Sequence, residues 1–468
     1  MRFKVLSVLI AGTTAATLAD AQTGETWATY RGNPARTGSD GQAGPREATV
    51  LWAFKSRDHY IASPLPLGDR LYVSGLGAFN RGLFACLSTR PDAKTRTLWA
   101  RQSTGPTVSS PGAFKSWLIF GDGMHQTNGA SVYCLDAVEG RRVWRRSIRG
   151  DLVHVEGSPT LVDGKAYVGG GNAGVLCFEI ERATLNGKAY GLPELQKLNA
   201  ATLKELQAKY EIARKTDPFA FPPSEDQLPE AEPKLLWQQG KDKWHVDAPI
   251  NVVGDRVLVC SAFLDEERVG DRALFCLDAK TGDLVWRVPL KINPWGGPSV
   301  LGATVVVSGS SIGYDHDAIK GAKGSIAAYD LKKGELKWHK DIPGGVVACA
   351  ALASNSAVVT STDGKVRAFD MATGERQWIY DAKHPLFAPA AIAKDIVYAG
   401  DLASVIHAID LNGGAGLWKL DLGAHPKVQA PGMIYAGPVV SGGRLHTATC
   451  NLQGPAAGGK TVVVCVGE

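Results

Sequence analysis

The sequence predicts an all-β fold, an eight-bladed β-propeller of four-stranded antiparallel blades, because one motif recurs along almost the whole chain. In this motif an Asp precedes a Gly by four residues and a Trp by eight. Five clear copies end at Trp144, Trp286, Trp338, Trp378 and Trp418, degenerate copies end at Trp99 and Trp237, and a lone strand carries Trp52. Successive Trp residues lie 40 to 52 positions apart, apart from one interval of 93, and about 40 to 50 residues is typical of one blade.

Each part of the motif has a physical role. The Asp and Gly predict a turn that reverses the chain between two strands. The Trp is a large apolar plate that we expect to pack between neighbouring blades. Upstream of the turns apolar residues alternate, as at 165–169 and 175–178, which indicates strands.

The two ends of the chain are expected to close the ring together. The repeats begin with only the last strand of a blade, around 50–52, and end with three strands at 437–440, 444–449 and 461–466. We therefore expect the N-terminal strand to complete the last blade, which removes free sheet edges. This arrangement predicts a monomeric propeller over residues 45–468.

The first residues predict export. A charged start, an apolar run over 5–18 and a small-residue cleavage site at Ala19-Asp20-Ala21 indicate a signal peptide over 1–21. The apolar run is shorter than the roughly 20 residues that span a bilayer, and no later stretch predicts a transmembrane segment. The first cysteine is Cys86, so we expect a soluble periplasmic or extracellular protein that is not a lipoprotein. Residues 22–44 form an N-terminal extension that either wraps the outside of the ring or is a flexible leader.

The charge balance gives no sign of a polyanionic partner. The formal net charge is +5 over 468 residues, which argues against nucleic acid binding. The local exception is the run 141–149, which contains five Arg residues. This run is either an anion or lipid-headgroup patch or a set of charges that protects an edge strand from pairing.

A block at 184–233 interrupts blade three between its third and fourth strands. Leucines at helical spacing predict one or two amphipathic helices over 193–214. A Pro-rich acidic stretch then returns the chain to the blade. The block is either a partner-binding arm or a helix folded onto the lower face of the blade.

Residues 454–461 satisfy the phosphate-loop pattern letter by letter. That pattern binds phosphate only where a strand leads in and a helix follows. Residues 462–466 instead predict another strand, so we interpret the match as a coincidence.

The eight cysteines are expected to be structural. A repeat position that is Ala in other blades is occupied in five blades by Cys86, Cys134, Cys177, Cys276 and Cys465. A site that accepts either residue favours a small buried side chain, and equivalent positions on successive blades are out of disulfide reach. Cys260, Cys349 and Cys450 lie on other strands, and pairing among them in an oxidising compartment stays open.

One face of the predicted ring gathers most histidines and acidic residues. The loops that lead into the first strand of each blade and the loops that join the second and third strands share this face. The incoming loops carry His59, Tyr60, His154, Glu156, His245, Asp247, Trp295, Phe387 and Tyr435. The second-to-third loops add His125, the acidic run 264–268, Tyr314, Asp315, His316 and Asp317. These loops converge on the mouth of the central channel over blades one, two, four and five, which makes this rim the candidate ligand or partner face.

Imidazoles and carboxylates at this face are also side chains that metals use as ligands. Spacing along different blades does not establish a ligand geometry, so no metal site is assigned. The alternative is a set of exposed loop residues that bond to the neighbouring backbone.

The repeats resemble those of the pyrroloquinoline-quinone (PQQ) type propeller family, whose unit reads Ala-x-Asp-x-x-Thr-Gly with a Trp four residues on. The resemblance spans nearly all of 45–468, and in size and export the chain is similar to the BamB-like group. The namesake of that group is an eight-bladed lipoprotein that helps outer-membrane protein assembly. The resemblance therefore implies a non-catalytic binding propeller with protein partners in the cell envelope, although a lipid-bearing Cys is lacking here.

The same resemblance implies a second function, a PQQ-dependent quinoprotein oxidoreductase of alcohol or sugar dehydrogenase type. In such enzymes the quinone lies on the propeller axis, calcium polarises it, an acidic base takes the substrate proton and a Trp stacks on the ring. Residues 309–330 are similar to one of their repeats, so the resemblance makes Trp295 the candidate stacking residue and Asp315 or Asp317 the candidate catalytic carboxylate.

Two departures count against this enzyme. The adjacent disulfide-forming cysteines of the alcohol-oxidising members are absent, and the sequence shows no convincing set of calcium ligands. Neither PQQ nor calcium is therefore assigned. Because a shared fold does not by itself establish a shared function, we expect binding rather than catalysis. A sugar- or metal-binding propeller is the third alternative.

Overall fold

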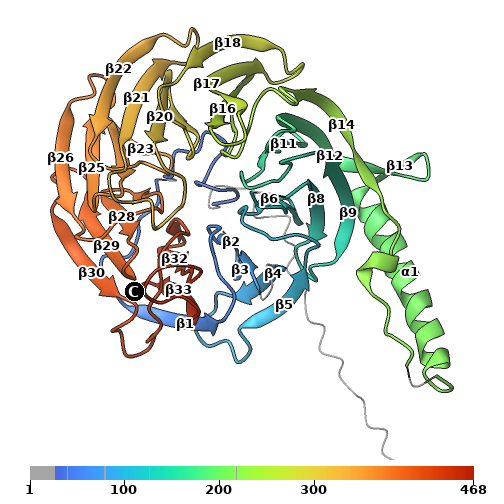
Figure 1. Cartoon of the computed structure of the whole chain (residues 1–468). Helices are drawn as coiled ribbons and strands as arrows, with labels where there is room; N and C mark the ends of the chain where they lie inside the picture. Colours follow the sequence, from blue (N-terminus) through green and yellow to red (C-terminus); the bar gives the residue numbers. More distant parts are fainter. Residues whose placement is uncertain (1–26, 40, 78–80, 126, 218) are drawn as a thin grey trace, which may run out of the picture.

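Eight sheets surround a central axis in the computed structural model, which describes residues 27–468 except 40, 78–80, 126 and 218 (Figure 1). Seven sheets have four antiparallel strands and one has five. The predicted eight-bladed all-β propeller is therefore confirmed. None of the described helices is long and apolar enough to cross a membrane, and the predicted signal peptide lies outside the described residues.

The first four blades follow one another along the chain, each from its innermost strand outward. Blade one contains β2 (Leu65–Leu67), β3 (Arg70–Leu76), β4 (Gly82–Ser88) and β5 (Thr97–Gln102), and blade two contains β6 (Gly112–Phe114), β7 (Trp117–Gly121), β8 (Gly129–Asp136) and β9 (Arg142–Arg149). Blade three contains β10 (Thr160–Val162), β11 (Lys165–Gly169), β12 (Val175–Leu185), β13 (Lys188–Gly191) and β14 (Glu232–Gln239). Blade four contains β15 (Asn251–Val253), β16 (Arg256–Leu264), β17 (Val269–Asp278) and β18 (Leu284–Pro289).

The other four blades complete the circle. Blade five contains β19 (Pro298–Leu301), β20 (Thr304–Ser310), β21 (Gly324–Asp330) and β22 (Leu336–Ile342), and blade six contains β23 (Ala351–Ala353), β24 (Ser356–Thr360), β25 (Lys365–Asp370) and β26 (Arg376–Asp381). Blade seven contains β27 (Ala391–Ala393), β28 (Ile396–Gly400), β29 (Val405–Asp410) and β30 (Gly416–Asp421). Blade eight contains β31 (Val439–Ser441), β32 (Arg444–Ala448), β33 (Thr461–Val466) and, paired antiparallel with β33, β1 (Val50–Ser56). Residues 454–461 run directly into β33, so a strand and not a helix follows the phosphate-loop pattern.

The motif tryptophans join neighbouring blades. In seven of the eight, the indole Nε1 donates to a backbone carbonyl of the next blade over 2.7 to 3.3 Å. Trp338, for example, donates to Met371, the residue that follows the motif Asp of the next blade. Trp144 is the exception, because its buried Nε1 has no partner in the described part of the chain. In the blade that it faces, β12 continues as a strand through the position of the motif turn.

The motif Asp and Gly shape the turn that receives each Trp. Asp370 Oδ1 accepts hydrogen bonds of 2.9 Å from the backbone of Ala372 and Thr373, and Gly374 has a φ of +72°. A Cβ on Gly374 would lie 2.5 Å from the Trp338 ring. The same contact with the preceding Trp recurs at Gly140, Gly282, Gly334 and Gly414. Contacts between neighbouring blades therefore determine the spacing of Asp, Gly and Trp in the motif.

The residue opposite each Trp on the adjacent strand is small. Across the ring this residue is Cys86, Cys134, Cys177, Cys276, Ala328, Ala368, Ala408 or Cys465. All of these side chains are completely buried, which confirms the predicted need for a small side chain. All eight cysteines, including Cys260, Cys349 and Cys450, are buried free thiols.

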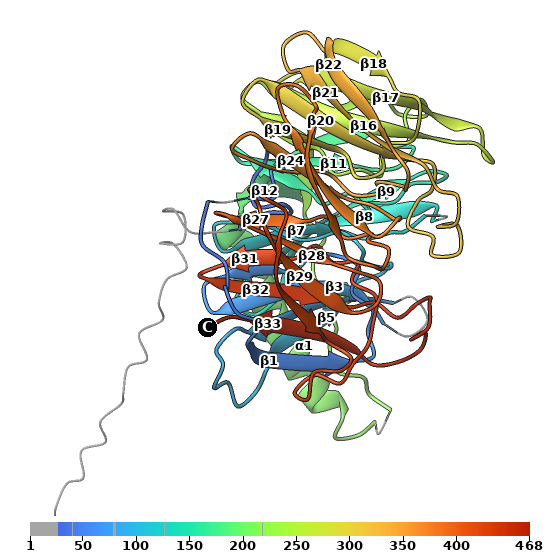
Figure 2. The same ribbon diagram turned by 90° about the vertical axis from the view of Figure 1, so that its left-hand side faces the viewer.

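Residues 27–39 of the N-terminal extension lie inside the ring, so the expectation that they wrap the outside is wrong. Their carbonyls accept hydrogen bonds of 2.7 to 3.0 Å from the inner strands β6, β15, β19, β23 and β27, through Ala28, Pro34, Ala35, Thr37 and Gly38. The innermost strand of a blade has an edge that no further strand covers, and its N–H groups need acceptors. The segment is the blue trace near the axis in Figure 1 and lies toward the face opposite the β16–β17 hairpin in Figure 2.

The described part of the insertion forms one α-helix, α1 (Leu192–Ala213), and a short 3-10 helix at Glu225–Gln227. Its first turns pack on the outer edge of blade two, where Leu192 and Leu195 are buried and Asn199 donates to the Arg142 carbonyl over 2.9 Å. The rest of α1 extends away from the ring (Figure 1). The helix therefore neither lies on the lower face of its own blade nor is wholly detached.

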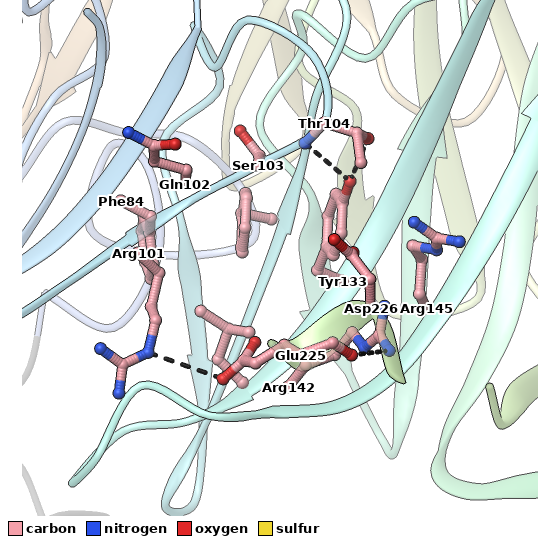
Figure 3. A pocket seen from close by; sticks show the side chains of 12 residues that line it. Phe84, Arg101, Gln102, Ser103, Thr104, Tyr133, Arg142, Arg145, Glu225 and Asp226 are labelled. Carbon is pink, nitrogen blue, oxygen red and sulfur yellow. Dashed lines mark hydrogen bonds and ion pairs between the residues drawn. The ribbon is translucent and has the colours of Figure 1, made fainter. Parts of the chain in front are cut away.

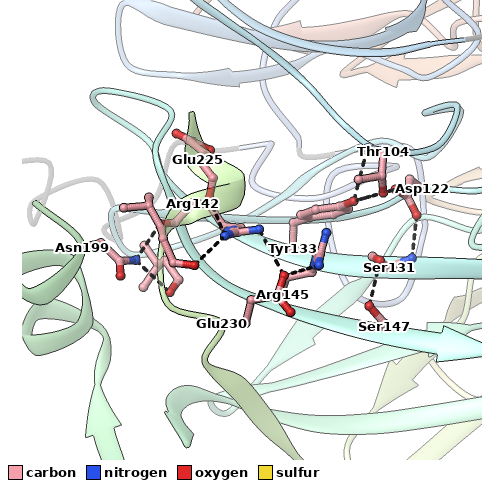
Figure 4. A network of polar contacts seen from close by, with 12 residues as sticks. Thr104, Asp122, Ser131, Tyr133, Arg142, Arg145, Ser147, Asn199, Glu225 and Glu230 are labelled. Atoms are coloured by element: carbon pink, nitrogen blue, oxygen red, sulfur yellow. Dashed lines mark hydrogen bonds and ion pairs between the residues drawn. The ribbon is translucent and has the colours of Figure 1, made fainter. Parts of the chain in front are cut away.

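The basic run 141–149 is covered by the chain itself. Its strand, β9, faces the returning segment 225–232, where Arg145 pairs with Glu230 and donates from its backbone N–H to Ala231 (Figure 4). Arg142 donates over 2.6 Å to the carbonyl of Glu225. The arginines therefore hold the Pro-rich acidic stretch in place. Neither the anion or lipid-headgroup patch nor the protected edge strand, the two interpretations of the sequence, included this role.

The turn glycines yield a test of the contact between blades. We expect Gly374→Ala to lower the free energy of unfolding by about 2 to 4 kcal/mol, because strain at a positive φ adds to overpacking against Trp338. Gly302→Ala is the matched control, since Gly302 has a φ of +59° but nothing within 4 Å of its Cβ position; its cost should be about 1 kcal/mol. Denaturant unfolding compares the two variants, and equal losses would contradict the packing role.

Candidate functional site

Three loops bring three histidines and an aspartate together at one rim of the ring. His125 lies between β7 and β8, His154 between β9 and β10, and His245 and Asp247 between β14 and β15. One ligand atom of each side chain lies within 4.8 Å of those of the other three. All four residues belong to the face predicted from the sequence. We call these four residues the His-Asp cluster.

The His-Asp cluster is compact and largely buried. The side chains of His154 and His245 have no exposed surface, whereas Asp247 is 10% and His125 is 40% exposed. Asp247 Oδ1 lies 2.7 Å from His154 Nε2 and 3.1 Å from His245 Nε2. The His125 ring lies edge-on to the other two, with centroid distances of 5.7 and 6.0 Å. Asp247 therefore lies between two buried imidazoles, and His125 links them to solvent.

Backbone hydrogen bonds fix the loop that carries His245. Its N–H donates to Ser261 Oγ and its carbonyl accepts from Ala262, both over 2.9 Å. Val246 exchanges two backbone hydrogen bonds of 3.1 Å with Gly171. The loop is thereby tied to blade four on one side and to blade three on the other.

Two glycines leave room for His154. A Cβ on Gly123 would lie 2.9 Å from the His154 Cα, and a Cβ on Gly171 would lie 3.0 Å from its Cε1. The next residue, Val155, donates its N–H to the Asp122 carbonyl over 3.0 Å. The buried position of this imidazole therefore depends on close backbone approach from blades two and three.

The hydrogen bond on the far side of the His245 ring sets its tautomer. Asn172 Oδ1 lies 2.7 Å from Nδ1, and an amide oxygen can only accept, so Nδ1 carries a proton. Nε2 faces Asp247 and is a buried atom with no hydrogen-bond partner among the described residues. If the His245 ring were neutral, the lone pair of Nε2 would face the carboxylate of Asp247. Because that contact is repulsive, the geometry favours a cation between the imidazole and the carboxylate.

Charge interactions within the cluster shift three pKa values. Burial acts to lower the pKa of His154, but the charge of Asp247 and the hydrogen bond to it raise that pKa overall. Burial acts to raise the pKa of Asp247, but His245 and His154 hold it well below its usual range. Burial and the charge of Asp247 raise the pKa of Glu156, whose Oε1 accepts the backbone N–H of His125. The cluster is therefore a site that keeps Asp247 ionised beside positive charge.

A loop of blade five covers another part of the same rim. Tyr314, between β20 and β21, donates over 3.3 Å to a carbonyl of the loop leading into blade six. Its ring packs against Phe387 and Tyr435, with centroid distances of 5.8 and 6.3 Å. The backbone N–H of His316 donates over 3.2 Å to Gln453 of blade eight. This Tyr314 loop therefore reaches from blade five across to blades seven and eight.

The other predicted residues do not join the His-Asp cluster. His59 and Tyr60 lie at the junction of blades eight and one, where Tyr60 is 1% exposed. Trp295 is partly buried, and its indole N–H has no partner among the described residues. Asp315 and Asp317 lie on the exposed part of the Tyr314 loop, and the side chain of Asp317 is 92% exposed.

Two cavities open away from the cluster. One of about 50 Å³ lies between blades one and two and the insertion, beside Tyr133 and Glu225 (Figure 3). The other, of about 180 Å³, lies on blades two and three beside Arg146. Pockets for drug-sized ligands usually have about 300 Å³ or more. Neither of these two cavities is lined by Trp295 or by the Tyr314 loop.

Sequence reasoning missed Asn172, because the loop between β11 and β12 is short and was not expected to contribute. Its position directly after three glycines, Gly169 to Gly171, was the available signal. Consecutive glycines allow close backbone approach, and that approach brings Asn172 to His245.

Arg36 of the N-terminal extension braces the loops that carry the cluster. Its fully buried side chain donates to the carbonyls of Ser158 over 2.8 Å and Ile250 over 3.3 Å. Ser158 lies four residues after His154, and Ile250 lies three residues after Asp247. Burial lowers the pKa of the guanidinium to about 10, so the group stays charged at neutral pH. The extension therefore supports the site from inside the ring.

This brace can be tested by comparing Arg36 with Arg46, an exposed arginine nearby in the sequence. Arg36→Met leaves buried carbonyls without donors, and we expect it to lower the free energy of unfolding by about 3 kcal/mol. Arg46→Met removes an exposed ion pair with Asp395 and should leave the free energy of unfolding almost unchanged. Chemical denaturation measures both changes. A loss for Arg36→Met no larger than for Arg46→Met would show that the brace does not stabilise the ring.

Comparison with known proteins agrees with the architecture. A family model described as outer membrane protein assembly factor BamB matches residues 44–189, 229–341 and 276–466. Quinohemoprotein alcohol dehydrogenase ADH IIB of Pseudomonas putida is 34% identical over 115 residues, which are 22% of this chain and only 16% of that enzyme. The match therefore spans a small part of the enzyme's length.

Solved structures share the fold at low identity. BamB from Moraxella catarrhalis superimposes with a TM-score of 0.59 and 14% identity, covering 89% of this chain and 99% of that one. Quinohemoprotein alcohol dehydrogenase from Comamonas testosteroni gives a TM-score of 0.63 and 12% identity, covering 95% and 81%. At such identities these likenesses show the fold alone.

Proposed function

The chain belongs to the family of the outer membrane protein assembly factor BamB, and we propose that it is a non-catalytic binding propeller of the cell envelope. The signal peptide expected over residues 1–21 would export it, and the proposed partner is a protein of outer-membrane assembly. The proposed contact surface is the rim that carries the Tyr314 loop and the His-Asp cluster.

The observation that carries this proposal is the partly exposed ring of Tyr314, which is held on buried aromatic side chains. Phe387 and Tyr435 are almost completely buried beneath Tyr314, which remains 42% exposed. Leu452, next to the residue that the loop contacts on blade eight, is 43% exposed. Apolar side chains held on a firm base and rimmed by polar loops are typical of protein interaction sites.

The residues present do not fit a quinone with calcium. Asp315 and Asp317, the carboxylates considered for catalysis, lie on an exposed loop, and neither of the two cavities contains Trp295. The cluster that does gather ionisable groups offers three imidazoles, whereas calcium takes oxygen ligands. We therefore derive no oxidation step for this protein.

Site-specific photocrosslinking in the native envelope tests the proposed partner surface. A photoreactive residue at Tyr314 should form a covalent adduct with an outer-membrane assembly protein, identified by mass spectrometry. The same residue at Leu336, which is 59% exposed on the outer strand β22, is the matched control and should not. Adducts from neither position, or equally from both, would contradict the proposed surface.

Added PQQ and calcium test the enzymatic alternative. We expect no change in the absorbance spectrum and no rise in Tm at saturating concentrations of both, because a ligand that binds only the folded state must stabilise it. A rise in Tm together with a shifted quinone absorbance would overturn the non-catalytic proposal.

A further inference from the structure

We propose that the His-Asp cluster binds one divalent transition-metal ion, with zinc as the simplest example. The site would be formed by His125, His154, His245 and Asp247, from the loops of three neighbouring blades. The inference goes beyond the proposed partner binding and does not depend on it.

The chemistry of the side chains selects the class of ion. Three imidazole nitrogens and one carboxylate oxygen form a ligand set that suits zinc, copper or iron. Calcium and magnesium prefer sites built from oxygen atoms. The eight cysteines are buried in the blades, and none belongs to this group of potential ligands.

The distances among the four potential ligand atoms are close to those of a metal site from which the ion is absent. The four ligand atoms lie within 4.8 Å of one another, and Asp247 Oδ1 lies 2.7 Å from His154 Nε2 and 3.1 Å from His245 Nε2. Tetrahedral zinc with bonds of about 2.0 to 2.1 Å holds its ligand atoms about 3.3 Å apart. Closing the widest separations to this value requires movements of up to roughly 1.5 Å, mostly of His125, which is 40% exposed.

The direction of the buried His245 Nε2, which lies 3.1 Å from Asp247 Oδ1, is the strongest single indication of a ligand. The side chain is completely buried, Asn172 holds the proton on Nδ1, and Nε2 faces the cluster without a hydrogen-bond partner among the described residues. Imidazoles that bind metals almost always donate their other N–H to an oxygen in this way. Asn172 is thus a positioning residue that keeps the nitrogen lone pair directed at the ion.

The acidic groups around the His-Asp cluster favour the binding of a doubly charged cation. Glu156 accepts the backbone N–H of His125 and so places a second carboxyl group beside the cluster. Glu267 Oε1 lies 3.9 Å from His125 Nε2. An ion entering past His125, the exposed member of the cluster, would replace repulsion among these acidic groups with attraction.

Zinc binding to the tag-free full-length protein, stripped with a chelator and measured by isothermal titration calorimetry, tests the site. We expect one zinc per chain, no binding of magnesium or calcium at this site, and a rise in Tm that a chelator reverses. His125→Ala should weaken zinc binding at least tenfold. Because its side chain is 40% exposed, this substitution should leave the metal-free Tm almost unchanged.

Matched variants separate metal ligation from general effects. His339→Ala removes a histidine that is 30% exposed and lies 3.8 Å from an aspartate on an outer strand, and it should bind zinc like the wild type. Asn172→Ala should weaken binding about tenfold or more. Zinc binding that is absent, or that is equal in wild type and His125→Ala, would overturn the proposal.

Cobalt substitution reports the ligands directly. One bound Co²⁺ should give the intense visible bands of a four-coordinate site, without the thiolate charge-transfer absorption that cysteine ligands produce. The visible bands should be lost in His125→Ala. A thiolate band, or weak bands typical of six-coordinate cobalt, would show that the ion binds elsewhere and would contradict the assignment.

Discussion

The contact between the Trp of one blade and the turn Gly of the next is the constraint on which the ring depends. Five of the eight indoles lie where a Cβ on that Gly would stand, and their N–H groups donate to a carbonyl nearby on the same turn. These contacts link successive blades around most of the ring. At the closure β1 supplies Trp52, which donates to Thr89 of blade one. Because these contacts involve the outer strands, the loops at the rim can vary without loss of the fold.

The one indole without a partner marks the region where the repeat is modified. Trp144 meets blade three, in which β12 continues into the insertion instead of turning. The missing contact is replaced by α1 on the edge of blade two and by the ion pairs that Arg145 and Arg146 make with the returning segment. The His-Asp cluster lies over blades two, three and four. Its side chains come from loops around the modified blade, where close backbone approach replaces the regular repeat.

The fold could be predicted because the residues of the motif are those that make the contacts between blades. The Cys or Ala opposite each Trp follows from the same packing. Four residues of the predicted face, His125, His154, His245 and Asp247, do come together. Their convergence was not predictable, because it depends on the rotation of three blades about a common axis. The position of the extension was also missed: nothing in residues 27–39 shows that the inner strands need acceptors there. Asn172 was overlooked because loop length says nothing about where a side chain points.

Similarity to both BamB and quinoprotein dehydrogenases shows the shared propeller fold and therefore cannot decide between them. The decision rests on the rim of this chain, which has two parts. On one part, Tyr314 packs on Phe387 and Tyr435 and leaves an exposed aromatic surface. On the other, two completely buried imidazoles share one carboxylate, an arrangement that costs free energy unless a positive charge lies within it. A protein partner would use the first surface, whereas an ion in the second would hold the loops of three blades together. The two roles are compatible, because a stiffer rim lowers the entropy that a partner must remove on binding.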